Sequence, residues 1–335
     1  MGEQEPGGDA ERTVRTRVWQ HGKLTAEDFP LDRVSDQLTH DGCVVWADVV
    51  GDDHETLGRI ADELGLDPHA VEDAVSAHER PKIDRYDGYL FLNTHAVRFD
   101  RAKGTVDVRK ISAFITEHAL ITVHHQPILD SLDLLDRWDS APELLEYGVA
   151  GLLHGLVDVV VDSHFDAVQA LDEEIDGLED LLFDDKAHGR EIQLRTFALR
   201  KSLVRLRRVV LPMREVVNTM MRRDHHLLDV DLLPYYQDVY DHVLRASEWT
   251  ESLRDMVSTV FETNLSLQDA RLNNIMKKLT SWAAIIAVPT AVTGFYGQNV
   301  PYPGDGSHWG FWVSSIVIVV LAIALYSGFK KRDWL

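Results

Sequence analysis

The chain has 335 residues, of which 34 are Lys or Arg, 55 are Asp or Glu and one is Cys. A hydrophobic fraction of 45% excludes a wholly disordered chain, and the single Cys43 excludes a disulfide framework or a Cys-based zinc finger. The net charge of −21 disfavours a nucleic-acid-binding protein, which needs a basic face. Because the first residues are polar and acidic, we predict no secretory signal peptide and a disordered segment over residues 1–12.

Residues 13–139 are predicted to form an α/β domain in which helices cover a mixed sheet, because strand-like and helix-like segments alternate. The strand-like segments are rich in β-branched and aromatic residues, and the helix-like segments separate the first two of them. The predicted strands are Cys43–Val50, Tyr89–Phe99, Lys110–Ile115 and Ala119–His124, and the predicted helices are Thr56–Leu64 and Pro68–Ser76.

Residues 140–231 are predicted to form a helical hairpin. Ser140 is the predicted N-cap of the first helix, which has Pro142 in its first turn and runs to about Leu182. The second half of this helix is acidic, and the helix that follows is basic. We favour an antiparallel pair with complementary charged faces. The alternative is that the acidic face binds cations or the basic end of the chain.

Residues 232–278 are predicted to form a long stalk helix that continues into the apolar segment after it. No Gly or Pro occurs between Pro234 and Pro289, so nothing in this stretch breaks a helix. Leucines recur every seven residues within it, which is the repeat of helices that pack about a common axis. The repeating positions are Leu265, Leu272 and Leu279.

Two segments, residues 279–299 and 309–329, contain no charged residue. Each is long enough to cross a bilayer, which takes about 20 residues in a helix. Lys and Arg flank the outer ends of this pair and are missing between the two segments. The positive-inside rule then places both termini in the cytosol and the short loop outside. We expect the hairpin to lie in the plasma membrane, in contact with lipids. We predict an external loop over 300–308 and a basic cytosolic tail over 330–335.

Small and weakly polar side chains follow one face of the first predicted span. Thr280, Ala283, Ala287, Thr290 and Gly294 recur at spacings of three and four residues, which places them on one side of a helix. Close helix packing through small residues explains this stripe, and so does the lining of a water-filled pore. The stripe alone does not decide between these two interpretations.

Several segments of the chain resemble the CorA-type magnesium channel family, the two-transmembrane Gly-x-Asn superfamily. The end of the first span resembles the family's Tyr-Gly-Met-Asn signature, with Gln298 in place of Met. Further matches lie in the N-terminal domain, in the long helix and at the basic end of the chain. The matching segments are Phe295–Asn299, Arg80–Lys82 with Tyr89–Phe91, Asp238–His242 and Lys330–Leu335.

This resemblance implies a funnel-shaped homopentamer that conducts divalent cations passively through one central pore, Mg²⁺ first and Co²⁺ second, without a cofactor. A ring of Asn299 carboxamides at the external mouth would hydrogen-bond the waters of hydrated Mg²⁺, which this ion sheds reluctantly. Met276 and Leu279 would form a hydrophobic constriction that closes by dewetting. The predicted pore residues, from the resemblance and the stripe together, are Asn273, Met276, Leu279, Thr280, Ala287, Thr290, Gly294, Gly297, Gln298 and Asn299.

The resemblance also implies regulatory divalent-cation sites between neighbouring cytosolic domains. Asp238 matches one such carboxylate, and we place its partner at Asp100, after the predicted strand Tyr89–Phe99. Two carboxylates from different copies repel each other unless a cation bridges them. Cytosolic Mg²⁺ would then hold the pore closed, and its depletion would loosen the assembly.

Two rival functions remain. Gln298 departs from the family signature and leaves the ion preference open, so a ZntB-type zinc transporter is one alternative. A membrane-anchored cation sensor that moves no ion is the other. The predicted spans contain no Asp, Glu or His, which favours passive conduction over a proton relay. An enzyme is not expected, because the sequence has no phosphate-binding Gly-rich loop, dinucleotide fingerprint or His-Glu-x-x-His motif.

Overall fold

The computed structural model describes residues 14–38, 42–51, 54–76, 79–182, 189–222, 230–298, 304 and 306–335. It divides into two units, Met1–Val260 and Phe261–Leu335. The predicted regions 13–139 and 140–231 both belong to the first unit. The predicted disordered segment 1–12 and most of the predicted external loop lie outside the described residues.

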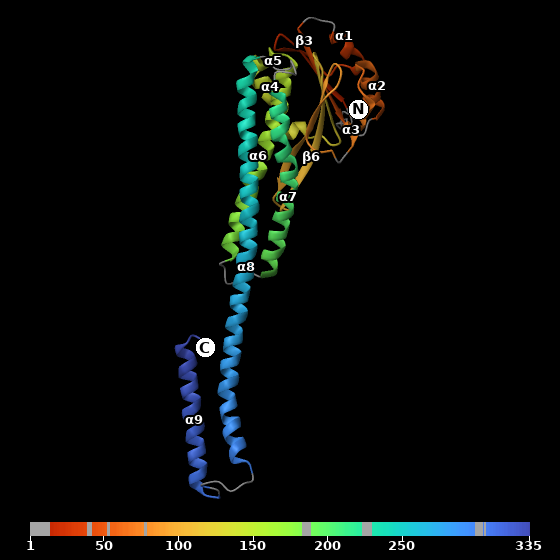
Figure 1. The fold of residues 1–335 in the computed structure, drawn as a ribbon. Coiled ribbons are helices and arrows are strands. Elements are labelled where there is room, and N and C mark those ends of the chain that lie inside the picture. The colour runs from red at the N-terminus through yellow and green to blue at the C-terminus, as the bar shows by residue number, and fades with distance from the viewer. Residues whose placement is uncertain are drawn as a thin grey trace, which may run out of the picture. The chain divides into compact units, whose positions relative to one another are not determined.

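The first unit is built on one sheet of seven strands. These are β1 Val14–Gln20, β2 Lys23–Glu27, β3 Cys43–Val50, β4 Lys82–Arg85, β5 Leu90–Asp100, β6 Thr105–Ile115 and β7 Ala119–His124. Their order in the sheet is β2-β1-β3-β7-β6-β5-β4 (Figure 1). The β3–β7 pair is parallel and the other neighbouring pairs are antiparallel, which confirms the predicted mixed sheet. The predicted strands correspond to β3, β5, β6 and β7, whereas β1, β2 and β4 have no predicted counterpart.

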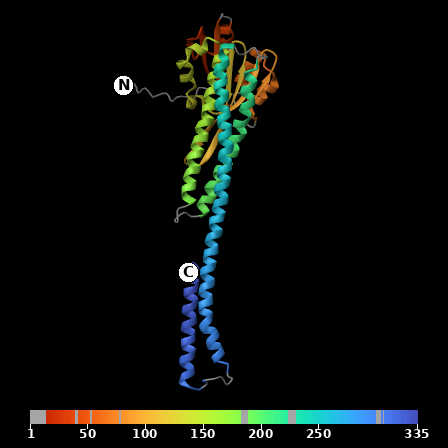
Figure 2. The ribbon, with the colours of Figure 1, turned by 60° about the vertical axis from the view of Figure 1, so that its left-hand side comes forward.

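Helices cover both faces of the sheet (Figures 1 and 2). They are α1 Val34–Leu38, α2 His54–Leu64, α3 Pro68–Val75, α4 Leu134–Ser140, α5 Pro142–Leu145, α6 Val149–Leu182, α7 Gly189–Met220 and the first part of α8 Leu233–Tyr296. Side chains of a strand alternate between the two faces. On β5, Leu90 and Leu92 are buried with α6, whereas Phe91 is buried with α2 and α3. The sheet therefore supports two separate apolar cores.

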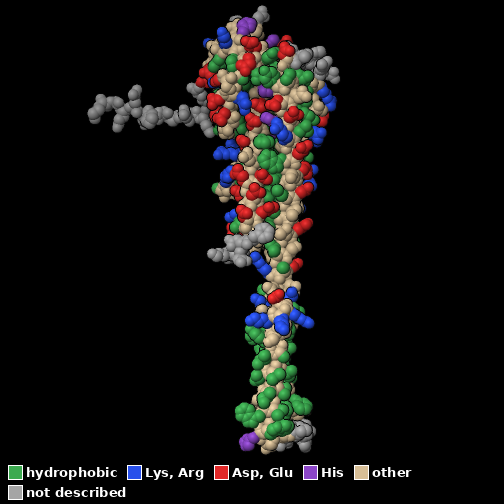
Figure 3. All heavy atoms as spheres, turned by 90° about the vertical axis from the view of Figure 1, so that its left-hand side faces the viewer, with side chains coloured by type: hydrophobic (Ala, Val, Ile, Leu, Met, Phe, Trp, Pro, Cys, Tyr) green, Lys and Arg blue, Asp and Glu red, His purple; other side chains and the backbone are tan. Residues whose placement is uncertain are grey.

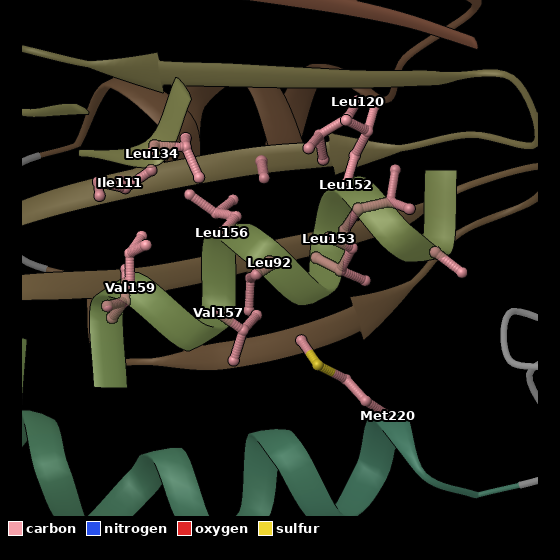
Figure 4. Packing of buried hydrophobic residues seen from close by; sticks show 14 of the residues in the cluster. Leu92, Ile111, Leu120, Leu134, Leu152, Leu153, Leu156, Val157, Val159 and Met220 are labelled. Atoms are coloured by element: carbon pink, nitrogen blue, oxygen red, sulfur yellow. The ribbon is translucent and has the colours of Figure 1, made fainter. Parts of the chain in front are cut away.

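The larger core lies between the sheet and α6. Figure 4 shows Leu152 and Leu156 of α6 among the strand residues Leu92 and Leu120, and all four side chains are buried. Full burial of such a side chain stabilises the fold by about 1.5–3 kcal/mol. Cys43, at the start of β3, is buried in a smaller cluster of apolar residues under α1.

The predicted helix start at Ser140 is wrong. Ser140 is the last residue of α4, and its hydroxyl donates to the Arg137 carbonyl at 2.9 Å, while Ala141 precedes the short helix α5. Gly148 then adopts a φ of +69° before α6 begins at Val149. Glycine adopts this left-handed conformation without strain. The helix is therefore interrupted at Gly148, where the sequence pattern predicted one continuous helix.

The hairpin of α6 and α7 is confirmed, but its charge pairing is not. The two helices lie side by side and run in opposite directions (Figures 1 and 2). No ion pair joins them among the residues that the structure describes. Arg207 of α7 pairs with Glu251 of α8, and Glu173 of α6 pairs with Arg101. Apolar side chains make up most of what both helices bury, so packing and not charge complementarity joins them.

Gly155 of α6 gives a direct test of how tightly this core is packed. A methyl group at Gly155 would lie 2.5 Å from Nε1 of Trp138, which donates to the Leu152 carbonyl at 3.0 Å. Trp138 also contacts Trp19 and Trp46 edge to face. Gly155→Ala is therefore expected to displace this indole and to destabilise the chain by about 1–3 kcal/mol, measured as a lower midpoint of thermal unfolding.

Gly177 on the same helix is the matched control, because a methyl group there would meet nothing within 4 Å. Gly177→Ala is expected to stabilise α6 by roughly 0.5–1 kcal/mol, since alanine loses less backbone entropy on folding. An equal effect of the two substitutions would contradict the tight contact with Trp138.

The second unit is a hairpin of the remaining part of α8 and α9 His308–Lys331. Both helices are long and apolar enough to cross a membrane, and hydrophobic side chains cover the hairpin while Lys and Arg gather at one end of it (Figure 3). The predicted helix start near Pro234 is confirmed, and α8 continues through Pro289 to its end. Near its end the Thr293 hydroxyl donates to the Pro289 carbonyl at 2.8 Å, the bond to the preceding turn that a threonine within a helix can make.

Candidate pore face and candidate cation cluster

Most of the predicted pore residues lie on one face of α8. At about 100° per residue, seven of them point into a sector of about 120°. Their side chains, or the glycine backbone, are all exposed in the single chain. The residues are Asn273, Met276, Leu279, Thr280, Ala287, Thr290 and Gly294.

The opposite face of α8 is the less exposed one. Ser281 is 0% exposed, and Ile285, Val288 and Val292 are half-buried. The element that lies beside this part of α8 is α9 (Figures 1 and 2), so this is the face turned to α9. The stripe of small residues therefore does not pack the two helices of the hairpin together. Packing within the hairpin is excluded as its explanation, and contact with other copies, with lipid or with water remains.

The signature residues follow the end of α8. The backbone N–H of Gly297 donates to the Thr293 carbonyl at 2.9 Å, and that of Gln298 donates to the Phe295 carbonyl at 3.3 Å. These bonds close the last turn of the helix, whose C-terminal carbonyls carry a partial negative charge that favours cations. Asn299, the predicted ring at the mouth, lies outside the described residues.

Two carboxylates and an imidazole meet between α6 and α8. Asp158 and Asp162, one turn apart on α6, and His242 of α8 have ligand atoms within 4.8 Å of one another. The Arg137 guanidinium holds both carboxylates, with Nη1 3.2 Å from Asp158 and Nη2 2.6 Å from Asp162. Asp238, the predicted regulatory ligand, is exposed one turn before His242 on α8. Carboxylate oxygens and an imidazole nitrogen are a ligand set that suits a divalent metal ion.

Burial sets the charges of this cluster. Burial raises the pKa of Asp158 and outweighs the lowering by Arg137, and the Asp162 carboxylate raises it further. Burial also lowers the pKa of the neighbouring His154, whose ring lies within electrostatic range of Asp238. A bound cation would favour the ionised form of Asp158, so cation binding here would release protons.

The structure gives Asp100 a local contact. Its carboxylate accepts from the backbone N–H groups of Ala102 and Lys103, at 3.0 and 3.1 Å, and pairs with the Lys103 ammonium. These contacts lower the pKa of Asp100, the hydrogen bonds with Lys103 most. Within the described part of one chain no contact joins Asp100 to Asp238, and their pairing across two copies stays a prediction.

Sequence reasoning missed Asp158 and Asp162 as candidate ligands. The available signal was their spacing of four residues, which places two carboxylates on one helix face. The third ligand, His242, lies in the Asp238–His242 segment, where only Asp238 was predicted as a ligand. Only the fold shows that α6 and α8 bring the two aspartates and His242 together.

Known proteins resemble the chain over most of its length. The family model described as CorA-like Mg²⁺ transporter protein matches residues 41–331. The cobalt/magnesium transport protein CorA of Thermotoga maritima is 30% identical over 301 residues, which cover 87% of this chain and 83% of that protein. The zinc transport protein ZntB of Yersinia pestis is 23% identical over 273 residues, which cover 80% and 81%.

Solved structures share the fold. The CorA magnesium transporter of Methanocaldococcus jannaschii superposes with a TM-score of 0.77 at 20% identity, over 96% of this chain and 98% of that one. The full-length CmaX protein gives a TM-score of 0.76 at 20% identity, over 97% and 100%. The likeness thus includes the sheet, the long helices and the apolar hairpin. Together with the family match over residues 41–331, it establishes that the chain belongs to the CorA-like Mg²⁺ transporter family.

Proposed function

We propose that the chain transports divalent cations, Mg²⁺ and Co²⁺ above all, across the plasma membrane as a passive channel of identical copies, with five copies expected. The observation that carries this proposal is the exposed face of α8, whose small, hydroxyl and amide groups the second span leaves uncovered. The Mg²⁺ and Co²⁺ transport named for the relatives supports it. The basic flanks of the hairpin support a topology in which both termini lie in the cytosol.

The pore forms where copies of this face meet, because one pair of helices cannot enclose a water column. Thr280 and Thr290 offer hydroxyls to the waters of a passing ion, and Gly294 leaves room for a hydrated one. At the mouth, neutral carboxamides of Asn299 hydrogen-bond the hydration shell of Mg²⁺ and do not replace it. A membrane potential of 100 mV drives a divalent cation inward by about 4.6 kcal/mol, so conduction needs no other energy source.

Met276 and Leu279 form the gate of this channel. They are 57% and 62% exposed in the single chain and lie on the same face as the hydroxyl groups. When copies assemble around an axis, these side chains form apolar rings. If the rings are narrow, water leaves the constriction and ions cannot pass. The gate opens when the copies move apart, which the cytosolic cation cluster controls.

The cluster of Asp158, Asp162 and His242, with Asp238 beside it, binds the regulatory cation, which takes the place of the Arg137 guanidinium on the two carboxylates. Asp162→Asn is expected to raise the Mg²⁺ concentration that half-protects the chain from trypsin by about tenfold, because it removes a charged ligand worth roughly 1.5–3 kcal/mol. Asp176→Asn, at an exposed position further along α6, is the matched control and should leave that concentration unchanged. If both variants were half-protected at the same Mg²⁺ concentration, the cluster would not be the regulatory site.

Ion flux through the purified chain in liposomes tests the transport itself. We expect uptake of Mg²⁺ and Co²⁺ that needs only a membrane potential. Uptake of Zn²⁺ driven by a proton gradient would instead support the second candidate, a zinc transporter, which the similarity to ZntB favours. Gln298→Met, measured beside it, shows whether the altered signature sets the preference among the three ions. Cation binding without any flux would leave only the membrane-anchored sensor.

A further inference from the structure

A cavity of about 610 Å³ lies in the first unit between α7, β6 and the segment that leads into β4. Its lining is basic, although the chain as a whole carries a net charge of −21. Arg205 and Arg208 come from α7, Arg80 from the segment before β4, and Lys110 from β6. Three separate elements thus direct cationic side chains at one concave space, which shares no residue with the pore face or with the cation cluster.

The arginines of this cavity are not neutralised by the chain. Among the described residues, Arg80 and Arg208 form no ion pair, and Arg205 donates only to the Val106 carbonyl, at 3.4 Å. The cavity is also lined by two acidic side chains, but both are engaged elsewhere. Glu79 pairs with Lys82 at 3.7 Å, and Asp107 accepts from Arg109 at 2.9 Å. Glu79 also lies within electrostatic range of Lys110 and offsets part of its charge. The three arginines thus supply the positive charge that faces the cavity without an acidic partner among the described residues.

Lys110 adds a fixed positive charge to the floor of the cavity. Its side chain is buried, and its ammonium group donates to the carbonyls of Asp73, Ala74 and Ser76 at the end of α3. Burial lowers the pKa of Lys110 to about 8, so the group is still mostly charged at pH 7. The three N–H groups of the Lys110 ammonium already donate to these carbonyls. Lys110 therefore attracts an anion through its charge alone, and the arginines make the direct hydrogen bonds to it.

A second cavity continues the first. It has a volume of about 760 Å³ and shares Val106, Asp107 and Arg205 with it. It adds Arg98, which forms no ion pair among the described residues, and further basic side chains that are paired locally. It is also lined by Asp100, the predicted partner of Asp238, whose carboxylate is paired with Lys103. Two adjoining cavities of this size hold a ligand much larger than a single phosphate ion.

We propose that these two cavities bind a nucleoside polyphosphate, with its phosphates on Arg80, Arg205 and Arg208 and the rest of the ligand toward Arg98. The planar guanidinium fork matches two phosphate oxygens at once, so several unpaired arginines around one space select phosphate groups. The concave shape favours a small anion over an acidic protein segment, which would need a broader surface. This site does not depend on the proposed transport function.

Binding of adenosine triphosphate to the full purified chain, measured by calorimetry without divalent cations, tests this proposal. Arg208→Ala is expected to weaken binding by about tenfold or more, because a charge-assisted pair is lost. Arg200→Ala is the matched control, since Arg200 is exposed on the same helix and does not line either cavity. It should leave the affinity within about twofold, as distant surface charges are screened by salt.

Other results would overturn the proposal. A failure to detect saturable nucleotide binding at millimolar concentration would refute the site. An equal loss of affinity in Arg208→Ala and Arg200→Ala would also refute it, because it would indicate general attraction to a basic surface. Inorganic phosphate that binds as tightly as the nucleotide would refute a polyphosphate site. Because binding is read directly, a chain that fails to transport ions can still pass this test, and the reverse holds as well.

Discussion

Asn299→Ala is expected to abolish selective Mg²⁺ uptake. In the proposed pentamer it removes five carboxamides that hydrogen-bond the hydration shell of the entering ion. At about 0.5–1.5 kcal/mol for each bond, the ring contributes roughly 2.5–7.5 kcal/mol to capture of the hydrated ion. The lower figure already corresponds to a loss of about 60-fold in affinity at the mouth. The partial negative charge at the end of α8 remains in the variant, so weak and unselective cation entry should persist.

Flux of Mg²⁺ and Co²⁺ into liposomes measures this effect. Asn274→Ala is the matched control, because it removes the same amide from a position on α8 that points away from the pore face. Its uptake should equal that of the unchanged chain. Normal selective uptake by Asn299→Ala would show that the mouth selects the ion by other groups.

Asp48→Ala is expected to destabilise the first unit by about 3–5 kcal/mol, the cost of leaving buried partners without their counter-charge. Asp48 is 0% exposed on β3. It accepts from the Thr122 hydroxyl at 2.5 Å, from Nε2 of His124 at 2.9 Å and from Nη2 of Arg15 at 3.0 Å. The other ring nitrogen of His124 lies 2.7 Å from the Gln126 carbonyl, so both nitrogens face acceptor oxygens.

The pH dependence of this loss follows from the charge of Asp48. Burial alone would raise its pKa, but the hydrogen bonds and charges of His124, Thr122 and Arg15 lower it below the ordinary value of 3.8. A carboxyl with a lowered pKa contributes its stability above the unfolded value and loses it as the pH falls through the folded value. The gap between the unchanged chain and Asp48→Ala should therefore be full at pH 7 and shrink below about pH 4.

Midpoints of urea unfolding at several pH values check this expectation. Asp139→Ala is the matched control, because Asp139 also pairs with an arginine of β1, Arg17, at 3.2 Å, but is 48% exposed. An exposed pair contributes at most about 1 kcal/mol, so this variant should remain close to the unchanged chain. Similar losses in both variants would contradict the role of burial.

The sequence predicted the strands that are buried along most of their length. β3 has seven buried residues in a row and β5 has eight, most of them apolar, so their composition identifies them. β2 is an edge strand with mostly exposed side chains, and β4 has four residues, none of them buried. Such strands are held by their neighbours' hydrogen bonds and leave little pattern in the sequence.

The pore face and the cation cluster also differ in how far the sequence predicts them. The pore face was predictable because it lies on one helix, where a period of 3.6 residues relates Thr280, Ala287 and Gly294. The cation cluster joins α6 to α8, and no local pattern indicates that Asp162 and His242 are neighbours. The break at Gly148 was missed because the proline signal for a helix start outweighed one glycine.

Because Cys43 is buried, the pore face can be mapped with reagents that label thiols. Cys43 is the single cysteine of the chain and is 6% exposed, so a water-soluble thiol reagent finds no reactive group on the folded protein. A cysteine placed at Thr290 or at Ile285 would then be the sole site of labelling. The contrast in their labelling rates in a native membrane reports directly which side of α8 is wet.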